Sequence, residues 1–399
     1  MCNIHKNSLP PDYTADGAYS LTPQKNLCYT TPMEMTLQQL EQMRPEGYLL
    51  VDIRDESAAA NGMIPGAICR SVCALDELPQ EKPVILYCKK GHISADVAGD
   101  LRDRGYDARS LAGGYVAWLM GRIAEDQALK IETSIRKKFH KAIFSRFTLG
   151  IRTYQLVQAG DKIAVCISGG KDSMLMAKLF QELQRHRKFP FELVFLVMDP
   201  GYAPENRAII ERNGAAMGIP LTIFETDIFD SVFNIEKSAC YLCARMRRGH
   251  LYSKARELGC NKIALGHHYD DVIETILMGM LWGAQIQTMM PKLRSTNFEG
   301  MELIRPMYLI READIKHFRD YHDLHFLQCA CRFTDTCSTD GSMVSKRTET
   351  KRLIQALKRE NPNVEHAIFR SVENVHLDAV VAYKQGGEVR HFLDGYRNN

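Results

Sequence analysis

Short apolar runs alternate with longer amphipathic runs in two separate parts of the chain. In the first part the apolar runs have four or five residues, as in a small α/β unit. The predicted strands are Leu49–Ile53, Val84–Cys88 and Ala108–Leu111, and the predicted helices are Met35–Met43 and Ile93–Arg104. This alternation begins near Met33 and ends near Gly121. We therefore predict a small α/β domain at residues 33–121, preceded by a loose leader at residues 1–32.

The second alternation follows a charged stretch with helical periodicity. No Gly or Pro stands between Arg122 and Leu149, which indicates a helical connector over residues 122–160. Four further strands are predicted, each followed by a plausible helix: Lys162–Ser168, Glu192–Asp199, Leu221–Asp227 and Lys262–His268. Such a pattern forms a parallel sheet with right-handed crossovers. The predicted fold class is α/β, with a doubly wound parallel-sheet domain at 161–380 that is mostly helical beyond Arg305, and a tail at 381–399.

Composition is that of a soluble globular protein with two domains. The 399 residues are 45% hydrophobic and 25% charged, and no apolar stretch is long enough to span a bilayer, so we expect no membrane association. The N-terminus has no basic start followed by an apolar segment, which favours a cytoplasmic location. The 12 cysteines should then stay reduced, which favours thiolate chemistry or metal ligation over disulfides.

The net charge of +3 does not by itself require a nucleic-acid partner. Three local runs are rich in Lys and Arg: Arg136–Arg152, Arg245–Arg248 and Lys346–Arg359. A solvated helix face explains each run about as well as RNA binding does. The three runs together favour RNA modestly.

The sharpest motif is SGGKDS, which follows an apolar strand and opens a predicted helix. Its residues are Ser168, Gly169, Gly170, Lys171, Asp172 and Ser173. Glycines let backbone N–H groups approach an anion, and the helix N-terminus adds partial positive charge. Lys171 can neutralise phosphate oxygens and Asp172 can orient Mg²⁺, so both are candidate catalytic residues. The alternative is a glycine-rich turn that binds nothing.

In this setting the motif resembles the PP-loop ATP pyrophosphatases, whose hallmark is SGGKDS after the first strand. The resemblance implies that ATP is cleaved between its α and β phosphates and that AMP is placed on a carbonyl or ureido oxygen. It also implies an adenine site near Met198 and Asp199, at the end of the second strand. The carboxyl end of a strand is the general location of ligands in open α/β sheets.

A second polar run, GHHYDD at residues 266–271, lies between a predicted strand and a helix predicted at Val272–Gly283. Its acids Asp270 and Asp271 can hold Mg²⁺, and its imidazoles can contact phosphate or the activated base. We take Asp271 as a candidate catalytic residue and His267 as a candidate ATP contact. Helix N-capping needs only one of the acids, and both roles can coexist.

Two cysteines spaced C-x-x-C, Cys240 and Cys243, head a further predicted helix. This spacing lets two thiolates reach one metal, and sulfur ligands suit zinc or iron–sulfur clusters. A redox pair or two buried thiols fit the same spacing. Cys329, Cys331 and Cys337 offer further ligands. Three ligands would leave one iron open to sulfur or substrate, whereas four would close the site.

Order and pattern together resemble the tRNA 2-thiocytidine synthetase branch of the PP-loop superfamily over residues 135–380. The shared stretches are SGGKDS, CYLCARMRRGHLY, KIALGHHYDDVIET, IRP, READI, the cysteine after HFLQ, and TKRLIQALKRENP. The resemblance implies a 4Fe-4S cluster on Cys240, Cys243 and, most simply, Cys329. The family usually has C-x-x-C at this last position, whereas here it is C-A-C, so Cys331 stays open as the third ligand. The resemblance also implies tRNA as partner and cytidine 32 as target.

Residues 33–121 resemble a single rhodanese domain. The matching pieces are LLVDIRDESAAANGMIPGAI, the loop CKKGHIS after the strand VILY, and LAGGYVAW. Cys88 stands at a strand end before a loop of N–H groups and a helix N-terminus, which stabilises its thiolate. We therefore expect Cys88 to carry a persulfide, although a degenerate structural domain is the alternative. The family commonly has arginine where Ile93 stands, so the donor is left open between a cysteine desulfurase and a small-molecule persulfide or thiosulfate.

The sequence thus predicts ATP-dependent tRNA thiolation. The C2 oxygen of a pyrimidine would be adenylated and then replaced by sulfur from Cys88, delivered through the iron–sulfur site. Two alternatives stay open: a PP-loop enzyme that modifies another RNA base or a small molecule without sulfur, and a non-enzymatic zinc or persulfide sensor. A homodimer is also left open, because the sequence gives no reliable oligomeric state.

Overall fold

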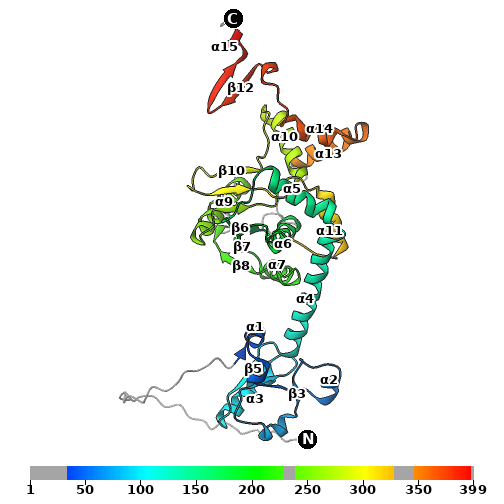
Figure 1. Ribbon diagram of the computed structural model, residues 1–399, viewed down its shortest axis with the longest axis vertical. Coiled ribbons are helices and arrows are strands. Elements are labelled where there is room, and N and C mark those ends of the chain that lie inside the picture. Colours follow the sequence, from blue (N-terminus) through cyan, green and yellow to red (C-terminus); the bar gives the residue numbers. More distant parts are fainter. Residues whose placement is uncertain (1–33, 229–238, 328–345, 397–399) are drawn as a thin grey trace, which may run out of the picture. The chain divides into compact units, whose positions relative to one another are not determined.

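A computed structural model divides the chain into two compact units, Met1–Leu119 and Met120–Asn399 (Figure 1). The structure describes residues 34–228, 239–327 and 346–396, and only the backbone of residues 239–244.

The leader predicted at residues 1–32 lies outside the described residues. So do Cys329 and Cys331, the candidates for the third ligand, and Cys337. None of the described helices is long and apolar enough to cross a membrane.

The first unit is built on a five-stranded, wholly parallel sheet in the order β1-β5-β4-β2-β3. Its elements are β1 (Glu34–Met35), α1 (Leu37–Glu41), a 3-10 turn (Pro45–Gly47), β2 (Leu49–Asp52), α2 (Glu56–Ala60), β3 (Ile68–Cys69), a 3-10 turn (Val72–Glu77), β4 (Val84–Tyr87), α3 (His92–Asp103) and β5 (Ala108–Leu111). The central strand β4 is buried at every position, and its alternate side chains enter two separate hydrophobic clusters. Both faces of a parallel sheet are normally covered in this way. The three predicted strands are confirmed, but β4 ends one residue early, so Cys88 is the first residue beyond it.

Helix α4 (Gly114–Arg136) leads into the second unit and is followed there by a π-helical turn (His140–Phe144) and α5 (Ser145–Thr153). Helices therefore occupy most of the stretch predicted as a basic connector. One face of this stretch is core rather than linker, because Ile135, Phe139 and Phe147 are fully or almost fully buried. Arg136, the first residue of the basic run, is ion-paired with Glu132 and Glu182.

The second unit contains a six-stranded sheet in the order β10-β11-β9-β6-β7-β8. Its remaining elements are β6 (Lys162–Ile167), α6 (Lys171–Arg185), β7 (Glu192–Asp199), α7 (Pro204–Ala216), β8 (Leu221–Glu225), α9 (Ala239–Glu257), β9 (Lys262–Ala264), α10 (Tyr269–Gly283), β10 (Lys292–Arg294), β11 (Glu302–Ile304), α11 (Glu312–Tyr321), α13 (Lys346–Glu360), α14 (Val364–Ser371), a 3-10 turn (Leu377–Ala379), β12 (Ala382–Gln385), β13 (Glu388–His391) and α15 (Phe392–Tyr396). Strand β6 lies at the centre, parallel to β7 on one side and to β9 on the other. The four predicted strands and their parallel pairing are confirmed, but β9 ends at Ala264 rather than at the predicted His268.

Several details of this unit differ from the prediction. Strand β11 extends the sheet in parallel beyond β9, and β10 adds an antiparallel edge. Both have three residues, too few for an alternating pattern to stand out. The predicted tail at 381–399, for which no element was predicted, contains a hairpin of β12 and β13.

Helix α10 begins at Tyr269, three residues earlier than predicted. Its N-cap is His268, whose ring accepts a hydrogen bond from the N–H of Asp271, while the Asp271 carboxylate accepts one from the N–H of His268. Of the two acids for which helix capping was the alternative role, only Asp271 takes part in the cap, and the N-cap residue itself is His268. Asp271 instead completes a reciprocal capping box from the third helical position.

A buried ion pair ties the amino ends of the sheet strands together. The ammonium of Lys262, at the start of β9, lies 2.7 Å from Oδ2 of Asp161 and donates to the carbonyl of Leu156. Burial opposes the ionisation of Asp161, but hydrogen bonds from Lys262 and Asn261 outweigh it and hold the pKa of Asp161 below its usual range. The pair fixes β6 and β9 in register at the end of the sheet opposite their carboxyl termini.

Asp161→Asn should lower the free energy of unfolding by about 2 kcal/mol at pH 7, because the buried ammonium of Lys262 loses its nearer carboxylate and keeps only that of Glu302, at 3.4 Å. The exposed pair of Lys254 and Glu257 supplies the control, and Glu257→Gln should change stability by less than about 0.5 kcal/mol. Since the pKa of Asp161 is depressed in the folded state, its contribution is present at neutral pH and is lost as the pH falls through that pKa. Urea denaturation measures both effects, and equal stabilities of wild type and Asp161→Asn at pH 7 would contradict them.

Candidate functional site

The carboxyl ends of four parallel strands meet at one edge of the larger sheet. Strands β6, β7, β9 and β11 are mutually parallel through their register, so the residues that follow them share this edge. These residues are Ser168 after β6, Asp199 at the end of β7, the run 266–271 after β9 and Arg305 after β11. Open α/β sheets bind their ligands in the crevice outside this edge. The two predicted polar motifs therefore belong to one site.

The SGGKDS turn is shaped by a glycine that no other residue can replace. Gly169 has φ +80°, and an added Cβ would lie 2.7 Å from the Ile210 side chain. Ser173 Oγ accepts a hydrogen bond from the Ser168 N–H at 3.1 Å and donates to the Gly170 carbonyl at 3.0 Å. The N-terminus of α6 has no side-chain cap, so its first N–H groups face the turn without a side-chain acceptor. Such a terminus is a ready site for a phosphate group.

Lys171 is held between two carboxylates. Its ammonium lies 3.0 Å from Asp172 Oδ2 and 3.5 Å from Glu312 Oε1. Burial opposes the ionisation of Glu312, but Lys316, Lys351 and Lys171 outweigh it and lower its pKa to about 2. The other oxygen of Asp172, Oδ1, is buried and has no hydrogen-bond partner among the described residues. Of the acids in this motif and the GHHYDD run, Asp172 is thus the one with an oxygen left over for a cation.

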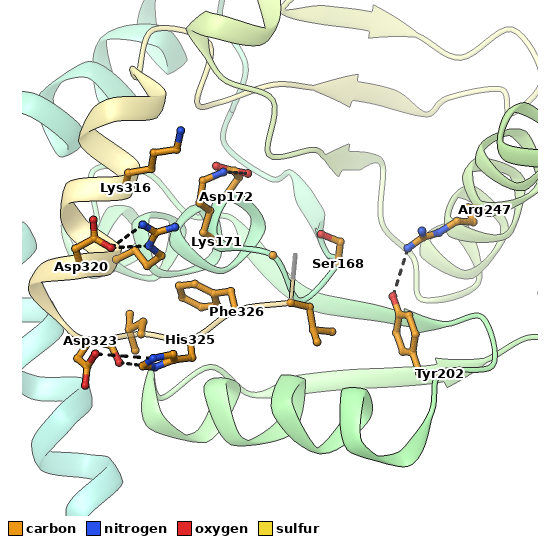
Figure 2. Close-up of a pocket in the computed structure, with 14 residues that line it drawn as sticks. Ser168, Lys171, Asp172, Tyr202, Arg247, Lys316, Asp320, Asp323, His325 and Phe326 are labelled. Atoms are coloured by element: carbon orange, nitrogen blue, oxygen red, sulfur yellow. Dashed lines mark hydrogen bonds and ion pairs between the residues drawn. The ribbon is translucent and has the colours of Figure 1, made fainter. Parts of the chain in front are cut away.

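A cleft of about 840 Å³ opens from this turn (Figure 2). Ser168, Lys171 and Asp172 line it on one side, and Tyr202 and Arg247 line it on another. Arg247 donates a hydrogen bond of 3.4 Å to the Tyr202 hydroxyl. The cleft offers cationic and hydroxyl groups around the phosphate-binding turn, as a nucleotide requires.

The predicted adenine contacts at the end of β7 have other partners here. Met198 is buried and packs against Ile228. The Asp199 carboxylate accepts hydrogen bonds from the N–H groups of Gly201 and Tyr202 and from Arg207. Asp199 thereby shapes the turn that presents Tyr202 to the cleft. Direct contact of Met198 and Asp199 with adenine stays a prediction.

Both acids of the GHHYDD run are engaged by basic groups. Asp270 accepts from Arg311 at 2.9 Å and from the N–H of Glu312 at 2.7 Å, and Asp271 lies 3.2 Å from Arg347. Where the chain is described, no group of three His, Cys, Asp or Glu side chains is placed to hold a metal ion. A role for Asp271 in Mg²⁺ binding would require Arg347 to release it.

His267 is half-buried, and its Nδ1 is buried and has no hydrogen-bond partner in the described part of the chain. Burial and the nearby charge of Arg305 lower the pKa of His267 to about 4, against the opposing effect of Asp271. The imidazole is therefore neutral at pH 7. A neutral ring can donate or accept a hydrogen bond at this edge of the sheet.

The loop that carries His267 is packed directly on the phosphate-binding turn. A Cβ added to Gly266 would lie 3.1 Å from the amide nitrogen of Ser173 and 3.2 Å from the carbonyl carbon of Asp172. These are backbone atoms, which cannot rotate away. The absence of a side chain at Gly266 thus lets the two motifs touch.

Gly266→Ala should push the loop away from the first turn of α6 and weaken ATP binding roughly tenfold, or about 1.4 kcal/mol. Isothermal titration calorimetry with ATP measures this. Gly249→Ala is the matched control, because an added Cβ there meets nothing within 4 Å. An unchanged affinity in Gly266→Ala would show that this contact does not position the turn.

Three groups of cysteines concern the predicted site: the C-x-x-C pair with its candidate third ligand, the core thiols, and Cys88 in the smaller unit. Cys240 and Cys243 lie on the backbone of the first turns of α9, where a spacing of three places them on one face of the helix. Their side chains, and Cys329 with Cys331, are outside the description. Cys166 and Cys260 are core thiols, as predicted, and burial raises the pKa of Cys166 to about 12.

Cys88 lies in a pocket of hydrogen-bond donors at the start of α3. Its sulfur accepts from the N–H of Gly91 at 3.1 Å and from the Ser94 hydroxyl at 3.5 Å. Burial raises the pKa of Cys88, but these donors outweigh it, so the pKa lies below the usual value. Gly114 supports the loop from behind, because its lack of a Cβ lets the chain approach Gly91 N. The geometry therefore favours the thiolate of Cys88 more than the surroundings of a solvent-exposed cysteine would.

Ser94→Ala removes a donor to the sulfur and should raise the pKa of Cys88. The rate at which iodoacetamide alkylates Cys88 should then rise only at higher pH than in the wild type, because the thiolate is the nucleophile. Peptide mass spectrometry follows Cys88 and, as an internal control, Cys73 in the same sample. Identical pH profiles of Cys88 in the two proteins would rule out stabilisation by Ser94.

Sequence reasoning missed the basic groups of α13 that reach this site. Arg347 and Lys351 contact Glu274 of α10 at 2.8 and 3.5 Å, and Lys351 also lies 3.5 Å from Glu312. The basic run Lys346–Arg359 indicates only a solvated helix face or an RNA contact. The spacing of four between Arg347 and Lys351, which puts both on one helix face, was the available signal.

Family models match both units of the chain. Residues 132–332, about half of the sequence, match the PP-loop domain, and residues 36–120 match the rhodanese-like domain.

Several curated relatives are similar to the PP-loop part. The chain is 33% identical over 254 residues to tRNA-cytidine(32) 2-sulfurtransferase of Acaryochloris marina, covering 63% of this chain and 84% of that protein. It is 35% identical to the protein of the same name in Cellvibrio japonicus, over 60% and 77% of the two chains. Among solved structures, it is 21% identical to the U34-tRNA thiolase NcsA from Methanococcus maripaludis with its 4Fe-4S cluster, with a TM-score of 0.45 over 57% and 76% of the chains.

Proposed function

Since this chain belongs to the tRNA-cytidine(32) 2-sulfurtransferase family, we propose that it uses ATP to replace the C2 oxygen of a tRNA pyrimidine with sulfur, with cytidine 32 as the target. One observation carries the proposal. A single chain combines an uncapped helix N-terminus behind SGGKDS with a rhodanese-like thiol, Cys88, whose surroundings favour the thiolate. The sulfur-free alternative leaves the second feature without a purpose.

Activation of the base occurs at the carboxyl edge of the larger sheet. The N-terminus of α6 and Lys171 hold the phosphates, while Asp172 supplies a carboxylate oxygen to Mg²⁺ that enters with ATP. The base oxygen attacks the α phosphate and pyrophosphate leaves, so the oxygen becomes part of an AMP leaving group. Neutral His267 contacts the nucleotide or the base, and Asp271 takes part once Arg347 is displaced.

Sulfur transfer begins at Cys88. Its thiolate attacks the sulfane sulfur of a persulfide or of thiosulfate, or receives sulfur from a cysteine desulfurase, and becomes a persulfide. We assign Cys240, Cys243 and Cys329 as ligands of a 4Fe-4S cluster, with Cys331 as the alternative to Cys329. These cysteines would hold the cluster, and the cluster would supply an iron that takes up the sulfur on its way to the base. A thiol reductant then supplies the two electrons that release this sulfur from Cys88 as sulfide, and the sulfide attacks C2 and expels AMP.

We propose the division of labour expected from the sequence. Residues 33–121 carry sulfur, 161–380 bind ATP and tRNA, and the positive residues of 122–160 and of the tail contact RNA phosphates. The location remains the cytoplasm, and a homodimer stays open.

Turnover by anaerobically purified protein tests the proposal. With tRNA, ATP and sulfide, AMP and pyrophosphate should appear in step with a thiolated nucleoside, and the protein should be brown with about four irons per chain. ATP cleavage without sulfur insertion would favour the sulfur-free enzyme. A colourless zinc protein that leaves ATP intact would favour the sensor.

Cys88→Ser should abolish thiolation driven by thiosulfate or persulfide, because no thiolate remains to accept the sulfane sulfur. It should leave turnover driven by sulfide within about twofold of wild type, since sulfide bypasses the carrier. Cys73→Ser, an exposed cysteine of the same unit, is the control and should support both reactions. Equal loss of thiosulfate-driven and sulfide-driven thiolation in Cys88→Ser would contradict the role of Cys88 as the sulfur carrier.

A further inference from the structure

Arg305 is a buried cation that has no ion-pair partner among the described residues. Three Lys or Arg residues are buried in the part of the chain that is described, namely Lys178, Lys262 and Arg305. Lys178 pairs with Glu132 and Lys262 pairs with Asp161. Arg305 is 8% exposed and makes no ion pair with any described residue. Removing a guanidinium from water without a partner is unfavourable by several kcal/mol in general, so native proteins normally compensate it.

The donors of Arg305 are only partly used. Nη1 donates to the carbonyl of Met290, and the backbone N–H of Arg305 donates to the carbonyl of Pro291. Nε is buried and has no partner among the described residues. A guanidinium with an unused Nε retains part of the planar fork that binds phosphate through two hydrogen bonds.

The surroundings of Arg305 are positive. The Nδ1 of His267 is also buried without a partner among the described residues, and the charge of Arg305 lowers the pKa of His267. The charge of Arg248 in turn lowers the pKa of Arg305. Arg248 is exposed at the surface of α9. Asp271 is the acid whose charge reaches both Arg305 and His267, and it is already engaged by Arg347. No carboxylate of the described residues therefore forms an ion pair with Arg305, and the charges closest to it are mainly positive.

We propose that Arg305, with His267 beside it, forms a subsite for a backbone phosphate of the bound RNA. Arg305 follows β11, on the same edge of the sheet as the phosphate-binding turn. The inference rests on the proposed function, because it takes RNA as the substrate.

Position favours RNA over ATP as the source of the phosphate. Strand β9 lies between β11 and β6, so Arg305 is two strands, roughly 10 Å, away from the turn after β6. The nucleotide cleft is lined by Tyr202, which follows β7, and by Arg247, which lies on α9. Arg305 does not line that cleft. An anion at Arg305 therefore lies beside the nucleotide, where the RNA strand approaches the activated base.

Binding of an unmodified tRNA transcript to the full-length protein, measured at several salt concentrations, tests the subsite. Arg305→Met should weaken binding roughly 10- to 100-fold, the range for a hydrogen bond to a charged group. It should also reduce the slope of log K against log salt by about 1, because one phosphate contact is lost. Arg305→Lys keeps the charge and should restore the slope, while the KM for ATP should stay unchanged in both variants.

Arg294→Met is the matched control. It removes the same charge from the neighbouring strand β10, where the side chain is 93% exposed, and should leave the slope unchanged. Thermal melting without RNA checks folding, and Arg305→Met should not melt below wild type because it removes an uncompensated buried charge.

Four results would overturn the inference. They are an unchanged slope in Arg305→Met, an equal fall in slope in Arg294→Met, a lower melting temperature with no change in slope, and a raised KM for ATP with unchanged RNA binding. Failure of the wild-type protein to bind tRNA would instead refute the proposed function, and the subsite with it.

Discussion

The parallel pairing of β6 with β7 on one side and β9 on the other is the constraint on which the larger unit depends. Parallel strands bring their carboxyl ends to one edge, so residues far apart in sequence meet there without any contact between their own side chains. The buried ion pair of Asp161 and Lys262 fixes the amino ends of β6 and β9, at the other edge of the sheet. The register that this ion pair fixes at the amino ends thus determines which residues lie side by side at the carboxyl ends. Parallel pairing thus brings Ser168, the GHHYDD run and Arg305 to the same edge, where Gly266 also packs on the SGGKDS turn.

The two units use the same local device for two different anions. In each, a buried parallel strand ends in a glycine turn that leads into a helix, β6 into α6 and β4 into α3. Gly169 and Gly91 both have positive φ, which only glycine adopts readily. The turn before α6 is lined by Lys171 and suits phosphate. The turn before α3 encloses the sulfur of Cys88 with N–H and hydroxyl donors and suits a thiolate.

The sequence predicted those parts of the structure that have a period or a motif. Long buried strands and the SGGKDS turn were found because their residues are consecutive. Strands β10 and β11 have three residues and lie outside any longer apolar run, so they carry no such signal, whereas the three residues of β9 were found because an apolar run includes them. The roles of Glu312, Arg347 and Arg305 were missed for another reason: a single charged residue looks like solvated surface until the fold shows what surrounds it. Burial of one face of the connector was likewise invisible, because its charged residues dominate the pattern.

Nucleoside mass spectrometry of tRNA tests the central claim most directly. The measurement compares a strain that lacks the gene with the same strain carrying the wild-type gene or a Lys171→Ala variant. The account predicts that 2-thiocytidine at position 32 is absent from the deletion strain, returns with the wild-type gene and does not return with Lys171→Ala. Unchanged 2-thiocytidine in the deletion strain, or its full return with Lys171→Ala, would contradict ATP-dependent thiolation by this protein.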